Sequence, residues 1–185
     1  TFPADDILPL INHGQIHFGE NKVQEAQEKW PDIKKNFPDI KLHMVGKLQS
    51  NKVKFAIPLF DYIHSLDNIK LAKKISDEQS KINKKLKIFI QVNIANEEQK
   101  SGIKPSELNS FYHTCVSEFN LNIIGLMCIP PNDNKANTYF SEMKKLKSII
   151  NLKDLSMGMS QDYLKAIENE ATYIRIGSKI FGSRV

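Results

Sequence analysis

Two short segments near the C-terminal end of the sequence combine hydroxyl side chains with glycine. The first is Ser156-Met-Gly-Met-Ser160 and the second is Gly177-Ser178. Glycine amides, hydroxyl groups and the start of a helix are the usual ligands of a phosphate group. Residues of these types are equally typical of turns and helix caps. Taken singly, the segments could be only turns and helix caps. Because two of them would lie side by side, a phosphate-binding site is the alternative interpretation.

Arg175 lies between the two segments, inside a strand-like stretch that also contains two isoleucines. Side chains alternate along a strand, so Tyr173, Arg175 and Gly177 would face one side and the isoleucines the other. A buried arginine is rare unless it is paired. One interpretation is an internal ion pair with Glu20 or another acid at a strand end. The other is a fixed cation that donates hydrogen bonds to a ligand.

Other reactive residue types are spaced less informatively. His13 and His17 are four residues apart, but Gly14 ends the helix that would align them, so no metal site is predicted. Cys115 and Cys128 lack the spacing of a metal or redox motif and are expected to be reduced, packed thiols. The chain has no glycine-rich nucleotide motif and no nucleophile elbow, and no catalytic residue is assigned.

The elements that must position these residues alternate regularly along the chain. Seven apolar, β-branched runs are each followed by a helix-like segment, at a spacing of 20 to 30 residues. The runs are Ile16–Gly19, Leu42–Val45, Asp61–His64, Leu86–Ile94, Leu121–Ile129, Leu155–Met157 and Tyr173–Ile176. Such alternation indicates βαβ units and a parallel sheet.

The chain opens on a helix, which gives eight predicted helices for seven strands. We therefore expect a single domain over residues 1–185, an α/β (β/α)8 TIM barrel whose first strand lies upstream of Thr1. In such barrels the chemistry sits at the carboxyl ends of the strands, and the loops after strands seven and eight often bind phosphate. With the absent strand counted as the first, the two hydroxyl-rich segments follow strands seven and eight.

Several helix boundaries are predicted from caps and prolines. The helix over Val23–Lys35 is expected to break near Pro31. The helix over Ser50–Ile57 should stop before Pro58, and Asp67 should cap the helix over 68–80.

The charge pattern limits the classes of partner. The formal net charge is +5 and the pI about 9.1, carried almost wholly by lysines that are spread over the helices among acids. This pattern favours a solvated helix exterior over a nucleic-acid-binding face. No apolar run approaches the roughly 20 residues of a membrane span. A cytoplasmic monomer is therefore expected, with neither a membrane nor a nucleic-acid partner.

Seven motifs, in order along the whole chain, resemble those of the pyridoxal phosphate homeostasis protein family. They are Phe18-Gly-Glu-Asn-Lys-Val-Gln-Glu25, His43-Met-Val-Gly-Lys-Leu-Gln-Ser-Asn-Lys52, Ile63-His-Ser-Leu-Asp67, Gln91-Val-Asn-Ile94, Gly125-Leu-Met127, Leu155-Ser-Met-Gly-Met-Ser160 and Arg175-Ile-Gly-Ser178 with Ile180-Phe-Gly182. The resemblance implies the barrel of the alanine racemase N-terminal domain. It also implies pyridoxal 5′-phosphate (PLP) as the cofactor, bound to a Schiff-base lysine that would lie just before Thr1.

The resemblance implies a role for each residue of a cofactor site. Arg175 would face the pyridine nitrogen, and Asn21 would line the side of the ring. The phosphate would be held by Ser156, Met157, Gly177 and Ser178 through hydroxyl and backbone groups.

The family further implies intracellular PLP homeostasis or delivery, with PLP-dependent apo-enzymes as recipients and no robust catalysis. An alternative is a small PLP-dependent amino-acid racemase or lyase. That alternative needs a second acid or base on the open face, for which His43, His64 and Tyr62 are the strand-borne candidates.

Overall fold

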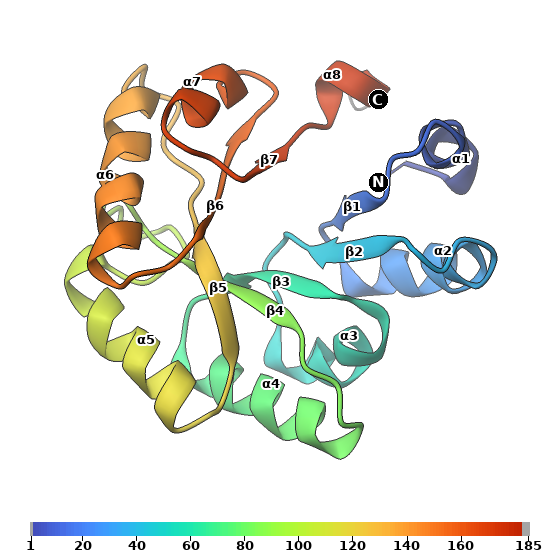
Figure 1. The fold of residues 1–185 in the computed structure, drawn as a ribbon, viewed down its shortest axis with the longest axis horizontal. Helices are drawn as coiled ribbons and strands as arrows, with labels where there is room; N and C mark the ends of the chain where they lie inside the picture. Colours follow the sequence, from blue (N-terminus) through green and yellow to red (C-terminus); the bar gives the residue numbers. More distant parts are fainter. Residues whose placement is uncertain (1, 183–185) are drawn as a thin grey trace.

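The computed structural model describes residues 2–182, and in this range seven parallel strands follow one another around one curved sheet (Figure 1). The strands are β1 His17–Glu20, β2 Lys41–Met44, β3 Tyr62–Leu66, β4 Lys87–Gln91, β5 Asn122–Met127, β6 Asp154–Met159 and β7 Tyr173–Arg175. Each pairs in parallel with the next. All seven predicted strands form, and each begins within one residue of its predicted start.

Helices connect the strands and cover the outside of the sheet. The α-helices are α1 Ala4–Asn12, α2 Val23–Asn36, α3 Val53–Leu59, α4 Ile69–Lys81, α5 Leu108–Ser117, α6 Ala136–Ile149, α7 Tyr163–Glu168 and α8 Ser178–Phe181. The 3-10 turns η1 Ser50–Lys52 and η2 Pro105–Glu107 precede α3 and α5. The expected α/β barrel is therefore confirmed as a nearly closed parallel sheet inside a ring of helices.

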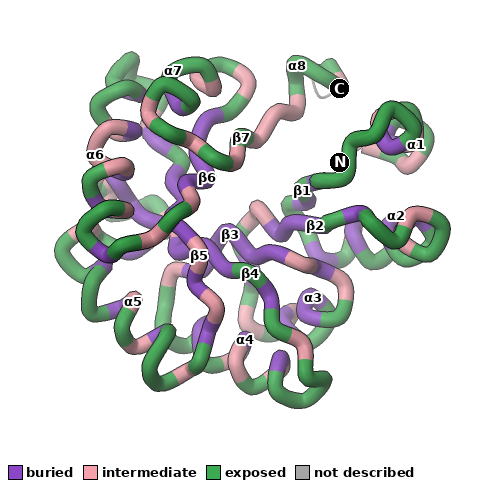
Figure 2. Tube along the Cα trace, in the orientation of Figure 1, coloured by how far each residue is buried: buried purple, intermediate pink, exposed green. Residues whose placement is uncertain are grey.

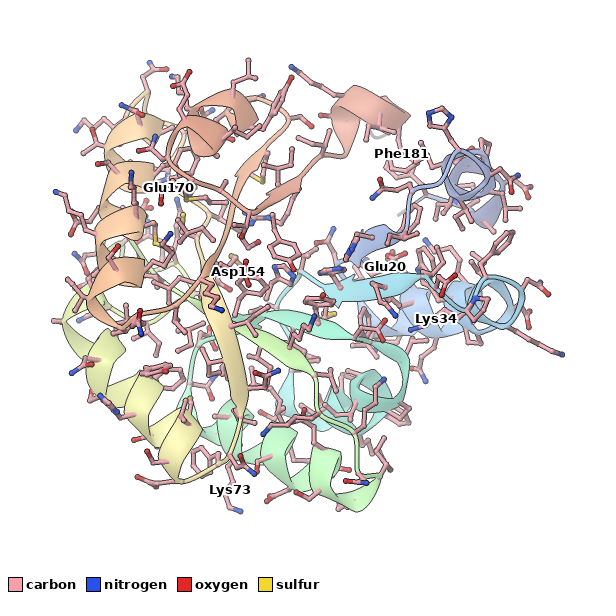
Figure 3. All side chains as sticks on the ribbon, viewed as in Figure 1. Glu20, Lys34, Lys73, Asp154, Glu170 and Phe181 are labelled. Atoms are coloured by element: carbon pink, nitrogen blue, oxygen red, sulfur yellow. The ribbon has the colours of Figure 1, made fainter. Side chains whose placement is uncertain are left out.

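The sheet has two edges, β1 and β7, which are the ends of the strand order. Figure 1 shows the chain termini on either side of the opening between these edges. Ring contacts bridge the opening: Phe181 stacks on Phe2 with centroids 4.6 Å apart, and His17 of β1 meets Tyr173 of β7 edge-on at 6.4 Å. Figure 3 shows Phe181 between α8 and α1. The stacked rings tie the last described helix to the start of the described chain.

The main apolar core lies between the sheet and the helices. Figure 2 shows buried residues along the strands and on the inner faces of the helices. Trp30, Phe60 and Phe140 are among the largest fully buried side chains of this layer. Outward-facing lysines meet acids one helical turn away, such as Lys73 with Asp77, in agreement with the predicted solvated exterior. Within residues 2–182, every helix falls short of the length or apolar character that a membrane span requires.

Two predicted helix breaks are wrong. Pro31 and Pro58 both lie inside continuous helices, α2 and α3. In α2 the buried side chains of Trp30 and Ile33 flank the proline and hold the helix against the sheet. This burial outweighs the loss of one backbone hydrogen bond, so packing decides the helix where the local rule fails.

The predicted cap of α4 is wrong by one residue. The N-cap is Asn68, whose side-chain oxygen accepts a hydrogen bond from the Leu71 backbone N–H at 2.8 Å. Asp67 instead accepts from the Asn68 amide group.

β6 runs two residues beyond its predicted end, to Met159, and α7 begins only at Tyr163. Gly158 makes this path available, because it has a φ of +91° and a Cβ there would lie 2.5 Å from the Cβ of Ala166. As a result Ser156 lies in the middle of the strand, whereas Ser160 follows its carboxyl end.

Candidate functional site

Arg175 ends β7 and its side chain points into the barrel. Its Nη1 donates to Ser156 Oγ at 2.7 Å and its Nη2 donates to the Cys128 carbonyl oxygen at 2.8 Å. The predicted alternative partner, Glu20, faces α2, where it accepts a hydrogen bond from Trp30 Nε1 and pairs with Lys29. The strand alternation that placed Tyr173 and Arg175 on the inner side is confirmed.

The guanidinium group is held by neutral partners. Burial lowers the pKa of Arg175, while Cys128 and Asp162 oppose that shift. A guanidinium still remains charged, because its ordinary pKa lies far above neutrality. Arg175 has five N–H donors, and the two bonds to Ser156 and Cys128 leave others free for an acceptor at the carboxyl ends of the strands.

The loops after β6 and β7 meet at one hydroxyl group. Ser160 Oγ accepts hydrogen bonds from the backbone N–H groups of Gly177 and Lys179, both at 3.4 Å. A Cβ on Gly177 would meet nothing within 4 Å, so the space beside the Gly177 Cα is open. Ser178 begins α8 beside it and is exposed. The arrangement of Ser160, Gly177, Ser178 and the Lys179 amide is referred to below as the loop cradle.

Ser160, at which the two loops meet, was not among the site residues predicted from the sequence. The signal was present, since the predicted hydroxyl-rich segment ran from Ser156 to Ser160. To choose between Ser156 and Ser160, one must know where β6 ends. The predicted end was Met157, whereas the strand ends at Met159 in the structure.

Ser156 and Met157 are both fully buried. The Ser156 hydroxyl group is engaged inside the barrel by Arg175 and His64. The Met157 side chain packs in the main core against the helices. The structure therefore brings Ser156 and Arg175 together, whereas Met157 can reach a ligand only through its backbone.

Asn21 directly follows β1 and its side chain is exposed. Its backbone is pressed against the loop after β2, because a Cβ on Gly46 would lie 2.2 Å from the Asn21 carbonyl oxygen. The Glu20 carbonyl oxygen also accepts hydrogen bonds from the amides of Val45 and Gly46. Asn21 thus has a fixed backbone at the same end of the sheet as Arg175.

Three histidines of neighbouring strands contact one another in a row: His43 and His64 are buried inside the barrel, and His17 of β1 is exposed. His17 Nδ1 lies 2.9 Å from His43 Nε2, and His43 Nδ1 lies 2.9 Å from His64 Nε2. His64 Nδ1 lies 2.8 Å from Ser156 Oγ. The rings contact a small interior cluster of Tyr62, Phe89 and Met127, beside which Tyr173 packs.

These interior rings do not supply the open-face acid or base that an enzyme of this fold would need. His43, His64 and Tyr62 are each buried inside the barrel, so the expectation that they could serve on the open face is wrong. Burial, reinforced by the charge of His17, lowers the pKa of His43 to about 3. Burial also lowers the pKa of His64 well below its ordinary value, with His43 and Arg175 adding to the effect. Both rings are neutral at physiological pH.

Comparisons with known proteins agree on one relationship. The chain matches the family model of the alanine racemase N-terminal domain over residues 3–185. Relatives named pyridoxal phosphate homeostasis protein, from Aquifex aeolicus and Homo sapiens, are each 37% identical over the whole of this chain. The match covers 84% of the first relative and 74% of the second.

Solved structures extend the comparison to three dimensions. PipY of Synechococcus elongatus PCC7942 is 34% identical, and the match covers 98% of this chain and 89% of PipY. The TM-score is 0.92 for PipY without PLP and 0.89 for PipY with PLP bound. Alanine racemase from Corynebacterium glutamicum is 13% identical, with a TM-score of 0.72. The match covers 98% of this chain and 52% of the racemase, and at this identity it shows a shared fold alone.

Proposed function

Since the chain belongs to the pyridoxal phosphate homeostasis protein family, on the fold of the alanine racemase N-terminal domain, we propose that it binds PLP and keeps the cofactor available without robust catalysis. The observation that carries this proposal is the convergence of hydrogen-bond donors at the ends of β6 and β7. These donors are the amides of Gly177 and Lys179, the Ser160 and Ser178 hydroxyl groups, and the free N–H groups of Arg175.

The chemistry of this donor set fits PLP, whose phosphate oxygens and pyridine nitrogen are acceptors. The two amides of the loop cradle reach Ser160 Oγ at 3.4 Å, beyond the usual range of about 2.7–3.2 Å. Both are therefore weakly satisfied, and a charged phosphate oxygen would be a stronger acceptor. Gly177 has no side chain to obstruct its approach.

We assign the contacts as follows. The phosphate is held by the amides and hydroxyl groups of Gly177, Ser178 and Ser160, with Met157 contributing through its backbone. Arg175 faces the pyridine nitrogen, with Ser156 fixing the guanidinium from behind. Asn21 lines the side of the ring, from the end of β1. The PLP-bound structure of the relative PipY supports PLP as the ligand.

Arg175 favours a holding role over turnover. PLP, when bound, supplies an electron-withdrawing pyridine ring that is strongest when its nitrogen is protonated. A guanidinium donates hydrogen bonds and remains charged, so Arg175 gives no proton to that nitrogen and opposes a second positive charge beside it. The neutral, buried His43 and His64 likewise have no access to the open face.

The protein acts in the cytoplasm as a monomer, and PLP-dependent apo-enzymes receive the cofactor from it. The names of the relatives, which refer to pyridoxal phosphate homeostasis, support a role in keeping PLP available.

The test is a PLP titration followed by near-visible absorbance, on a chain that carries the lysine predicted before Thr1. We expect a saturable band, fixation of PLP to that lysine by borohydride, and a changed spectrum in a folded Arg175→Ala variant. Exchange of the α-hydrogen of amino acids at a turnover rate would overturn the holding role in favour of a racemase or lyase. A spectrum that Arg175→Ala leaves unchanged would overturn the assignment of that residue.

A further inference from the structure

A continuous line of polar contacts connects the outer edge of the sheet with the proposed cofactor site. It begins at His17, whose ring is exposed on the edge strand β1, and passes through His43 and His64 to Ser156 and Arg175. The four internal distances are 2.9, 2.9, 2.8 and 2.7 Å in that order. The contacts step from β1 to β2 and β3 and then across the barrel to β6 and β7.

The direction of hydrogen bonding along this line follows from counting donors. Arg175 Nη1 can only donate, so Ser156 Oγ accepts that bond. If Ser156 also accepted from His64, its own hydroxyl hydrogen would need a further acceptor in a fully buried position. If Ser156 instead donates to His64 Nδ1, it makes one bond as donor and one as acceptor. Buried polar groups are almost always paired, so the second arrangement is favoured.

This choice at Ser156 fixes the tautomer of every ring. His64 must carry its hydrogen on Nε2 and donate it to His43 Nδ1. His43 must then donate from Nε2 to His17 Nδ1. His17 then carries its hydrogen on Nε2 as well.

We propose that His64 is a positioning residue for Arg175, acting through Ser156, and that His43 and His17 continue the same polarised chain of Nε2–H tautomers to the sheet edge. A hydroxyl group that donates a hydrogen bond becomes a better acceptor, so His64 strengthens the bond from Arg175 to Ser156. Together with the Cys128 carbonyl oxygen this holds both ends of the guanidinium. The effect of His64 on ligand binding rests on the proposed function, in which Arg175 faces the pyridine nitrogen of PLP.

The surroundings of the rings support a fixed, neutral chain. Tyr62 stacks on His43 with centroids 4.0 Å apart, and Phe89 stacks on His64 at 4.3 Å, which restricts rotation of both rings. The pKa of His17 is lowered by burial and by Lys41 and Lys87, against the opposing effect of Asp61.

The first test needs no ligand. Long-range ¹H–¹⁵N spectra of the histidine rings in the whole protein should show all three as Nε2–H tautomers at neutral pH. Ser156→Ala, which removes the inner donor, should change the ring nitrogen shifts of His64, His43 and His17 together. Tyr62→Phe is the control, since it removes a hydroxyl group beside the rings without breaking the chain. A predominant Nδ1–H tautomer of His64, or a change confined to His64 in Ser156→Ala, would overturn the proposal.

The second test measures positioning. His64→Phe keeps a flat ring but loses both nitrogens, and we expect its dissociation constant for PLP to rise about five- to tenfold. His64→Gln can accept from Ser156 and donate to His43, so it should restore most of the affinity. Equal affinities of the wild type and His64→Phe would refute the positioning role. If the wild type bound no PLP, the proposed function would fail, while the ring tautomers would still decide whether the chain exists.

Discussion

Ser156 and Ser160 are four residues apart in one hydroxyl-rich segment, yet their substitution by alanine should have opposite consequences. Ser156→Ala should destabilise the protein and Ser160→Ala should weaken ligand binding. The contrast arises because Ser156 Oγ is fully buried with two short hydrogen bonds, whereas Ser160 Oγ has two long ones beside open space.

The magnitudes follow from the bonds. Ser156 loses a charge-assisted bond, worth about 1.5–3 kcal/mol, and a neutral bond, worth about 0.5–1.5 kcal/mol. The expected loss of unfolding free energy is about 2–4 kcal/mol, or about 5–15 °C in Tm for a chain of this size. The bonds of Ser160 are too long to contribute more than about 0.5 kcal/mol, so its Tm should change by no more than about 2 °C.

Ligand binding should reverse the order of the two variants. In the proposed site Ser160 donates to a phosphate oxygen, and a hydrogen bond to a charged group is worth about 1.5–3 kcal/mol. Ser160→Ala should therefore raise the dissociation constant for PLP by about 10- to 100-fold.

The assay is a thermal melt of each variant without PLP, followed by a PLP titration of each at a temperature where it is folded. Equal losses of Tm in the two variants would refute the distinction between the buried and the accessible serine. An unchanged PLP affinity in Ser160→Ala would refute the loop cradle as the phosphate site.

Three further predictions concern packing, capping and pH. Gly46→Ala should lower the unfolding free energy by about 1–3 kcal/mol, as measured by urea unfolding. The added Cβ would lie 2.2 Å from the Asn21 carbonyl oxygen, so the backbone at Gly46 or at Asn21 must move. Asn68→Ala should cost about 1 kcal/mol by removing the cap of α4. His43 and His64 are neutral when folded and bind protons when unfolded, so the stability that they contribute above pH 6.5 should fall as the pH drops below it. At pH 5 the loss of unfolding free energy, measured by urea unfolding, is about 2 kcal/mol for His43, and His64 adds a loss of the same sign.

Each prediction has a matched comparison. Gly177→Ala adds a Cβ into open space and should leave the stability within about 0.5 kcal/mol, unlike Gly46→Ala. Asp67→Ala removes the acid beside the cap without removing the cap itself. His43→Phe should flatten the dependence of stability on pH between 6.5 and 5, and an unchanged slope would contradict the assignment to this residue.

The strands were predictable because their signal is local. A β-branched run ending in polar residues, such as Leu42–Val45, depends on nothing distant in the sequence. The continuity of α2 through Pro31 and of α3 through Pro58 was not predictable, because burial of neighbouring side chains decided it. Which serine reaches the loop cradle depended on where β6 ends, and end positions are the least certain part of a strand prediction.

The contacts between the three histidines could not be predicted from the sequence, for a different reason. The links from His17 to Ser156 join residues 26, 21 and 92 positions apart. Whether inward-facing side chains on neighbouring strands meet depends on the stagger of the strands around the barrel. The sequence showed that His43 and His64 are strand-borne, but only the register of the sheet shows that they meet each other and Ser156.

The interior of a parallel barrel is usually filled with layers of branched apolar side chains. Here part of that space is given to His43, His64, Ser156 and Arg175. Burying such groups is unfavourable unless each is bonded, and in this chain each one is. In residues 2–182 no carboxylate forms an ion pair with Arg175, so its hydrogen bonds go to the neutral Ser156 hydroxyl group and Cys128 carbonyl oxygen, while Asp162 acts on the charge from a longer distance. A cation fixed in this way keeps its remaining donors directed at the carboxyl ends of the strands, which is the requirement for holding a ring nitrogen without giving it a proton.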